Sequence, residues 1–128
     1  MAVTTYPVTG TFDFTAALAK VDPTVVNVFG PTLRDAAPAE FQAIAAAVLT
    51  EDYVTVRRLS HSWGGLFEAL GATPLVRHSQ QLEKFANIED AVGVASALGP
   101  MREDLARFCN SLTQMLETRS PGLSLRPF

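Results

Sequence analysis

Hydrophobic residues recur at intervals of three and four along most of this chain, the spacing that gathers them on one face of an α-helix. No segment of the sequence shows the two-residue alternation of a half-buried strand, and no internal repeat is evident. The longest run, near the C-terminus, has apolar residues at Leu98, Met101, Leu105, Phe108, Leu112 and Met115. The pattern therefore predicts an all-α fold.

Helix-start signals divide the N-terminal half of the chain into three predicted helices. Asp13 is expected to cap a short helix that ends at about residue 19. Asp22 precedes Pro23, and a capping carboxylate followed by proline favours a helix start at that point. We expect this second helix to run to about residue 35. Pro38 is expected to open a third helix, which ends before a break at residues 50–52.

The C-terminal half has similar signals. A helix from Asp52 is expected to end near Gly71, because glycine is common just after a helix. Thr73 before Pro74 is expected to cap the next helix, which runs to about residue 86. A link at residues 87–90 leads to a long final helix with Pro100 near its start.

Short links between long amphipathic helices favour antiparallel neighbours. The sequence therefore predicts an up-and-down antiparallel four-helix bundle with one or two additional N-terminal helices. We expect a single domain over residues 1–128, with a helical core of about residues 12–118 and an aperiodic tail at residues 119–128.

Composition narrows the possible functions. The 128 residues carry a formal net charge of −3, which argues against general nucleic-acid binding because proteins that neutralise phosphates usually have a basic face. Cys109 is the only cysteine, so a disulfide framework and a multi-cysteine metal site are excluded. The histidines and carboxylates have no metal-ligand spacing, and no nucleotide-binding motif occurs. We expect no metal and no cofactor on this chain.

The ends and the apolar runs of the sequence bear on its location. The N-terminus lacks the positive start and apolar centre of a signal peptide. No apolar run approaches the roughly 20 residues that span a bilayer. We expect a cytoplasmic protein without membrane contact.

The segment at residues 57–72, RRLSHSWGGLFEALGA, places two glycines inside a predicted helix just after His61. Each glycine costs about 1 kcal/mol relative to alanine in a helix, so Gly64 and Gly65 together cost roughly 2 kcal/mol. The absence of side chains beside an exposed imidazole leaves the ring accessible to another protein. We interpret the glycine pair as clearance around His61.

The helical wheel places His61 opposite the core face of its helix. At about 100° per residue, His61 lies roughly 170° from the centre of the apolar cluster. That cluster consists of Val56, Leu59, Trp63, Leu66 and Leu70. The outer face that includes His61 consists of Val54, Arg57, Gly64, Gly65, Glu68 and Ala72. We expect these outer residues to surround an exposed histidine.

The segment HSWGG at residues 61–65, followed by LGA at residues 70–72, resembles the signature of histidine-containing phosphotransfer (HPt) domains. In that family an apolar residue follows the histidine by two positions and a glycine by four, as Trp63 and Gly65 do here. A Leu-Gly-Ala turn and a later Leu-Glu pair, matched by residues 82–83, complete the pattern. The similarity extends from about residue 12 to residue 116.

The resemblance implies that His61 accepts a phosphoryl group from an aspartyl phosphate on a receiver domain and passes it to a second receiver. The implied partners are a response regulator and a hybrid sensor histidine kinase. The chain itself is expected to be a monomer without kinase activity, with the divalent metal on the receiver. One position departs from the family: the lysine three positions after the histidine is Gly64 here. Arg57, or Arg77 and Lys84 on the following helix, are candidates to supply the missing charge.

Other residues that carry reactive or polar groups have structural interpretations. His78 lies on a face with apolar neighbours and is expected to make a structural hydrogen bond at the edge of the core. Trp63 and Cys109 are expected to pack as core residues. Glu83 has two open interpretations: it orients the imidazole or a partner, or it is a solvated helix charge.

Two alternatives to phosphotransfer stay open at this point. The first is an HPt-like module that docks on a receiver or sensor kinase and regulates it without carrying phosphate. Gly64 in place of the lysine keeps that interpretation open. The second is a helical scaffold with no signalling role, in which the outward histidine and the glycines are coincidental.

Overall fold

A computed structural model of the chain describes residues 11–119, and within this part all regular structure is helical. The elements are α2 (Phe14–Ala19), α3 (Pro23–Leu49), α4 (Tyr53–Ala69), α5 (Thr73–Asn87) and α6 (Ala91–Arg119). The all-α prediction is therefore confirmed. The aperiodic tail expected at 119–128 lies outside the described residues, except that Arg119 is the last residue of α6.

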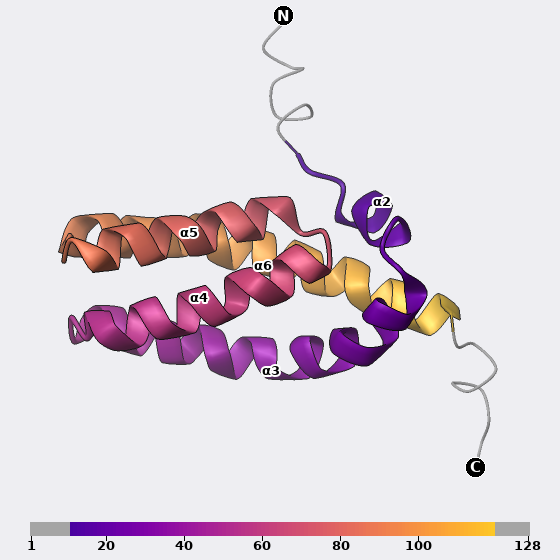
Figure 1. Cartoon of the computed structure of the whole chain (residues 1–128), viewed down its shortest axis with the longest axis horizontal. Helices are drawn as coiled ribbons and strands as arrows, with labels where there is room; N and C mark the ends of the chain where they lie inside the picture. Colours follow the sequence, from indigo (N-terminus) through magenta and orange to yellow (C-terminus); the bar gives the residue numbers. More distant parts are fainter. Residues whose placement is uncertain (1–10, 120–128) are drawn as a thin grey trace, which may run out of the picture.

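The four long helices lie lengthwise beside one another, and consecutive ones run in opposite directions (Figure 1). α3 packs against α4 and α6, and α5 packs against the same two helices. The short helix α2 packs against α6 at the end of the molecule where α4 turns into α5 (Figure 1). α4 therefore has a neighbour on each of two sides, α3 and α5.

The structure corrects one predicted boundary: α3 is a single helix that continues through Pro31 and Pro38. Each proline lacks an N–H, so the carbonyl four residues earlier loses its helical donor. The helix continues because both halves bury apolar side chains in the same core, among them Val26 and Ile44. The N-terminal part of α3 turns away from the line of its C-terminal part (Figure 1). We attribute this curvature to the two prolines.

Both predicted N-caps, Asp13 and Asp22, are present, and Asp52 caps the helix that was predicted to start there. The Asp13 carboxylate accepts a hydrogen bond from the Ala16 N–H at 2.9 Å, and Asp22 accepts one from the Thr24 N–H at 2.8 Å. Asp52 accepts from both the N–H and the hydroxyl of Thr55. These carboxylates accept hydrogen bonds from backbone N–H groups that would otherwise be unpaired at the start of a helix. They therefore explain where α2, α3 and α4 begin.

The turn between α4 and α5 is also where it was predicted, although its cap differs. Gly71 has a φ of +70°, a left-handed conformation that glycine adopts without a Cβ clash, and it ends α4. The residue before α5 is Ala72, which offers no side-chain cap, and Thr73 is already helical. The prediction that Thr73 caps α5 is therefore wrong.

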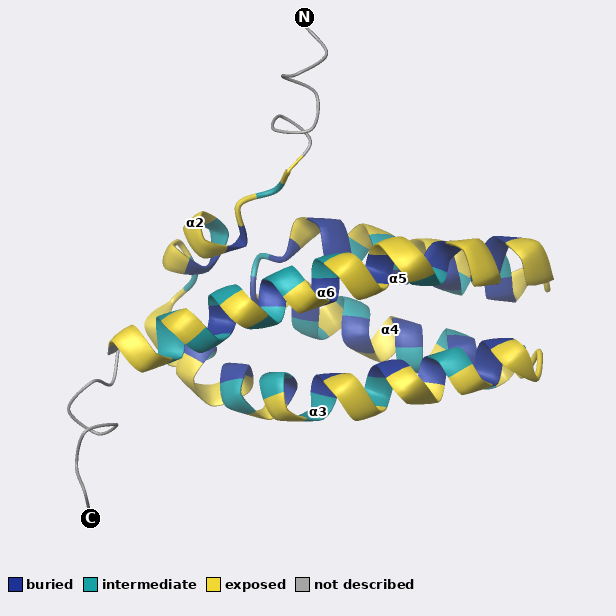
Figure 2. Cartoon of the chain, turned by 180° about the vertical axis from the view of Figure 1, so that it is seen from behind, coloured by how far each residue is buried: buried dark blue, intermediate teal, exposed yellow. Residues whose placement is uncertain are grey.

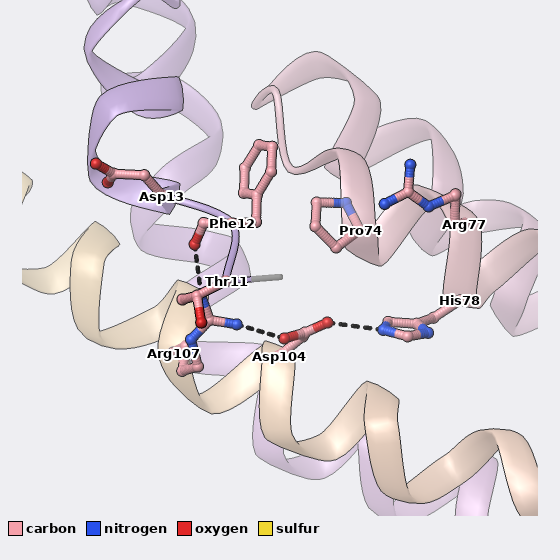
Figure 3. A pocket seen from close by; sticks show the side chains of 8 residues that line it. All are labelled: Thr11, Phe12, Asp13, Pro74, Arg77, His78, Asp104 and Arg107. Atoms are coloured by element: carbon pink, nitrogen blue, oxygen red, sulfur yellow. Dashed lines mark hydrogen bonds and ion pairs between the residues drawn. The ribbon is translucent and has the colours of Figure 1, made fainter. Parts of the chain in front are cut away.

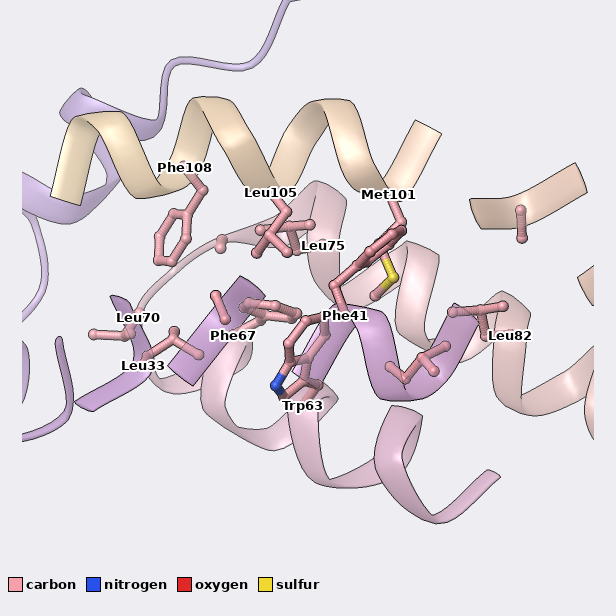
Figure 4. Packing of buried hydrophobic residues seen from close by; sticks show 14 of the residues in the cluster. Leu33, Phe41, Trp63, Phe67, Leu70, Leu75, Leu82, Met101, Leu105 and Phe108 are labelled. Carbon is pink, nitrogen blue, oxygen red and sulfur yellow. The ribbon is translucent and has the colours of Figure 1, made fainter. Parts of the chain in front are cut away.

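One hydrophobic core joins the described helices. Buried residues of the long helices face their neighbours and exposed residues face outward (Figure 2). The rings of Trp63 and Phe67 on α4 pack edge to face with their centroids 5.3 Å apart, and the centroids of Phe67 and Phe108 on α6 are 5.9 Å apart (Figure 4). Edge-to-face packing of this kind is favourable between aromatic rings. The indole N–H of Trp63 donates to the Glu40 carboxylate of α3. Trp63 is thus a core residue, as predicted.

Candidate functional site

His61 lies on the outer side of α4 and its side chain is 79% exposed. The wheel placed this histidine opposite the apolar face, and the structure confirms that orientation. The buried residues Val56, Ser60, Trp63 and Phe67 anchor α4 on its other sides. The imidazole is therefore held by a fixed helix while its ring stands in solvent.

A carboxylate from the neighbouring helix contacts the ring. The Nδ1 atom of His61 is 3.2 Å from Oε2 of Glu83 on α5, whose side chain is 40% exposed. A carboxylate accepts, so Nδ1 carries the proton in this arrangement, and in the neutral ring Nε2 keeps its lone pair. Of the two interpretations of Glu83 that the sequence left open, the geometry favours the one in which it orients the imidazole.

Gly65 has no packing reason to be glycine. A Cβ placed on this exposed residue would meet no described atom within 4 Å. In a helix interior the exchange of glycine for alanine gains about 1 kcal/mol, so the fold would be more stable with a side chain at this position. The open space above Gly65 is therefore a surface feature beside His61 and is not required for helix packing.

Gly64 is different, and here the structure corrects the sequence-based view. This glycine is half-buried, and a Cβ on it would lie 3.6 Å from the Cβ of Ser79 on α5. It therefore faces the α4–α5 contact as well as solvent. An alanine fits at ordinary van der Waals distance, whereas a longer side chain has to leave toward solvent beside His61.

The two glycines open onto a hollow of about 390 Å³ between α4 and α5. It is lined by Ser60, His61, Gly64, Gly65, Glu68, Val76, Ser79, Gln80 and Glu83. The hydroxyl groups of Ser60 and Ser79 are buried and have no hydrogen-bond partner within the described part of the chain. A buried hydroxyl without a partner is unusual because it carries a desolvation cost.

The candidate cations take separate positions. Arg57 and Lys84 line a second depression that shares Gln80 and Glu83 with the hollow beside His61. They flank the site, and neither lines the hollow itself. Arg77 lines a different pocket, which also includes His78 (Figure 3). The expectation that Arg77 belongs to the surroundings of His61 is therefore wrong.

The remaining predicted neighbours of His61 differ in whether they are exposed or buried. Val54, two helical turns before His61, and Glu68, two turns after it, are both exposed on α4. Ala72 is fully buried at the start of α5. Its predicted place on the exposed face is wrong because α4 ends at Ala69, so the helical wheel no longer applies at residue 72.

His78 has the structural role that the sequence predicted. Its Nε2 atom is 2.8 Å from the Asp104 carboxylate of α6, and its side chain is 17% exposed. Asp104 also pairs with Arg107, which donates to the carbonyl of Phe12 (Figure 3). This chain of contacts ties α5 and α6 to the segment that leads into α2.

Cys109 is partly covered on α6, and burial raises the pKa of its thiol. A raised pKa keeps the thiol protonated near neutral pH, so it is a poor nucleophile. This agrees with the predicted packing role.

Residues 11–119 include neither a metal-ligand cluster nor a membrane-spanning helix. No group of three or more His, Cys, Asp or Glu side chains is placed to hold a metal ion. No helix in this range has both the length and the apolar character needed to cross a bilayer. In comparisons with family models, curated proteins and solved structures, nothing matches this chain.

Proposed function

We propose that this chain is a histidine phosphotransfer protein of a two-component phosphorelay, with His61 as the phosphorylated residue. The observation that carries the proposal is the solvent-exposed imidazole whose Nδ1 contacts the Glu83 carboxylate. A neutral ring with its proton on Nδ1 presents Nε2 as the nucleophile. Gly65 leaves the approach to that ring open.

The proposed step is a direct phosphoryl transfer. The Nε2 lone pair attacks the phosphorus of an aspartyl phosphate on a receiver domain, and the bond between phosphorus and the aspartyl oxygen breaks. The electron pair returns to the aspartate as a carboxylate, while the Nδ1 proton stays in the hydrogen bond to Glu83. The positive charge that the ring gains lies next to this carboxylate, which favours the phosphorylated form. Reversal onto a second receiver completes the relay.

The sequence resemblance to HPt domains adds support from a different direction. The family layout, an up-and-down four-helix bundle with a short extra N-terminal helix, is compatible with the packing of α3 to α6 and the position of α2. The proposal includes the family's partners, a response regulator receiver domain and a hybrid sensor histidine kinase. It also includes a monomeric cytoplasmic carrier that has no kinase activity of its own.

A second candidate function rests on one specific residue. Gly64 occupies the position of the family's lysine, and a chain without that charge is suited to binding a receiver or sensor kinase without carrying phosphate. In that case the face around His61 is a docking surface, and the histidine is not phosphorylated.

The test separates these two functions. Purified chain is mixed with a panel of receiver domains that have been phosphorylated with radiolabelled acetyl phosphate, and the label is followed on gels. Phosphotransfer predicts an acid-labile, alkali-stable label on this chain. The label should disappear in His61→Gln and persist in His78→Gln, which is the matched control on the neighbouring helix. Receiver binding without label supports the docking module, and the absence of both supports the scaffold interpretation.

The clearance above Gly65 is tested by a pair of variants. Gly65→Ala adds one methyl group in open space and should raise the free energy of unfolding by up to about 1 kcal/mol. Gly65→Leu should remain folded and helical but should reduce receiver binding and transfer at least about tenfold, because the side chain obstructs the approach to His61. Normal transfer in Gly65→Leu would show that clearance at this residue is not required.

A further inference from the structure

The hollow beside His61 has a marked charge preference. Two carboxylates, Glu68 and Glu83, line it, and none of its described lining residues is lysine or arginine. The buried hydroxyls of Ser60 and Ser79, 0% and 1% exposed, lie on its α4 and α5 sides and lack partners in the described structure. A group that enters the hollow therefore meets carboxylate oxygens, and the two serines with unpartnered hydroxyls lie in its walls.

We propose that this hollow receives the side chain of a lysine from the docking partner. The inference rests on the proposed function, because it concerns the same surface and the same partner. An ammonium group has three donors and no acceptor, which matches a lining rich in acceptors. The lysine supplies in trans the positive charge that the family's lysine supplies from the position of Gly64.

The shape of the hollow fits this occupant. The aliphatic stem of a lysine needs an apolar wall, and Val76 on α5 provides one within the same lining as Gly64 and Gly65. The ammonium then reaches a carboxylate of the lining, Glu68 or Glu83. The volume of about 390 Å³ is near the lower end of the range for ligand pockets and is large enough to admit one long side chain.

The carboxylates explain why the positive charge is useful only when the partner is docked. The Glu83 carboxylate stabilises the positive ring, but it also adds negative charge near a phosphoryl group on His61, and like charges repel. A cation that enters with the partner offsets this repulsion during transfer and leaves with the partner afterwards. Arg57 and Lys84 do not line the hollow, so they are not placed to do the same within it.

The first test needs no partner. The ¹⁵N-labelled chain is titrated with n-butylammonium chloride, which mimics a lysine side chain, and with sodium butyrate as the anionic control. We expect saturable shifts of the amide signals of Gly64, Gly65 and Ser79 with butylammonium only. Glu68→Gln should weaken this binding about threefold, the size of a surface charge pair. Glu103→Gln, an exposed glutamate on α6, should leave it unchanged. Shifts that do not saturate, or that spread over all acidic residues, would overturn the proposal.

The second test asks whether a single substitution slows or accelerates phosphoryl transfer. Gly64→Lys fills the hollow from within and blocks the partner's lysine, so transfer from a phosphorylated receiver should slow at least about tenfold, whereas Gly64→Ala should transfer normally. Transfer that stays the same or accelerates in Gly64→Lys would overturn the inference while leaving His61 as the carrier. Butylammonium binding without any label on His61 would retain the cation site and reject phosphotransfer.

Discussion

The two histidines of this chain make similar contacts in opposite settings. His61 on α4 and His78 on α5 each lie beside a carboxylate from the next helix, Glu83 and Asp104 respectively. The ring of His61 is 79% exposed and that of His78 is 17% exposed. His78 also belongs to a longer chain of contacts that includes Arg107 (Figure 3), whereas the pair at His61 opens onto a hollow.

The comparison shows that a carboxylate partner does not by itself distinguish a reactive histidine from a structural one. The carboxylate fixes the ring in both cases, but it selects different nitrogen atoms. Nδ1 is engaged in His61, and Nε2 in His78. The nitrogen that remains free faces solvent in His61, while His78 is largely covered. The proposed transfer at His61 therefore rests on the exposure of its side chain rather than on the carboxylate contact.

The largest expected difference between the two rings is in chemical reactivity. Diethyl pyrocarbonate acylates unprotonated imidazole nitrogens, and peptide mass spectrometry measures the rate at each histidine. His78 has to leave Asp104 before it reacts, and an opening cost of about 1.4 kcal/mol slows a reaction tenfold. We expect His61 to react at least about tenfold faster. Equal rates at the two residues would contradict the assignment of their environments.

For the free energy of unfolding, we expect the larger effect at His78. His78→Gln removes a half-buried hydrogen bond that joins α5 to α6, and we expect a loss of roughly 1 kcal/mol in the free energy of unfolding. His61→Gln changes an exposed side chain and should stay within about 0.5 kcal/mol of the parent. Urea unfolding followed by circular dichroism gives both values. A larger loss for His61→Gln than for His78→Gln would reverse the comparison.

Several boundaries could be predicted because their causes are local. Asp13, Asp22 and Asp52 cap the helices they precede, and Gly71 ends α4 with a positive φ. Each of these signals acts within about four residues, so the sequence alone contains the required information. The outward direction of His61 was equally predictable, because it follows from the apolar periodicity of one helix.

The errors arose where the outcome depends on a neighbouring helix. A wheel treats α4 as having one buried side, but α4 packs against both α3 and α5. The contact with α5 half-buries Gly64 beside Ser79, and the turn after α4 buries Ala72. The continuity of α3 through Pro38 has a similar origin, since long-range packing outweighs the local preference for a break. The hollow and its two buried hydroxyls also come from both helices, and no single segment of sequence predicts them.

The protonated nitrogen of each ring provides a finer test of the comparison. We expect long-range ¹H–¹⁵N correlation spectra to place the proton of neutral His61 mainly on Nδ1 and that of neutral His78 mainly on Nε2, as the carboxylate contacts require. Glu83→Ala should lower the Nδ1–H fraction of His61 and leave His78 unchanged, and Asp104→Ala should do the opposite. The same proton position in both rings of the parent protein would remove the proposed role of Glu83.

Cys109 extends the comparison to a second type of nucleophile, with the smallest expected effect. Burial raises the pKa of its thiol, opposed by the nearby charge of Arg34, so the folded chain holds this proton more tightly than the unfolded chain. Its contribution to stability is therefore present below the ordinary thiol range and decreases as the pH rises through about 8.5. Cys109→Ala should flatten this part of the pH–stability curve. At pH 7.5 iodoacetamide should alkylate the folded chain about threefold more slowly than the urea-unfolded chain. A folded thiol that reacts as fast as the unfolded one would place an accessible nucleophile on α6, and exposure would then no longer single out His61.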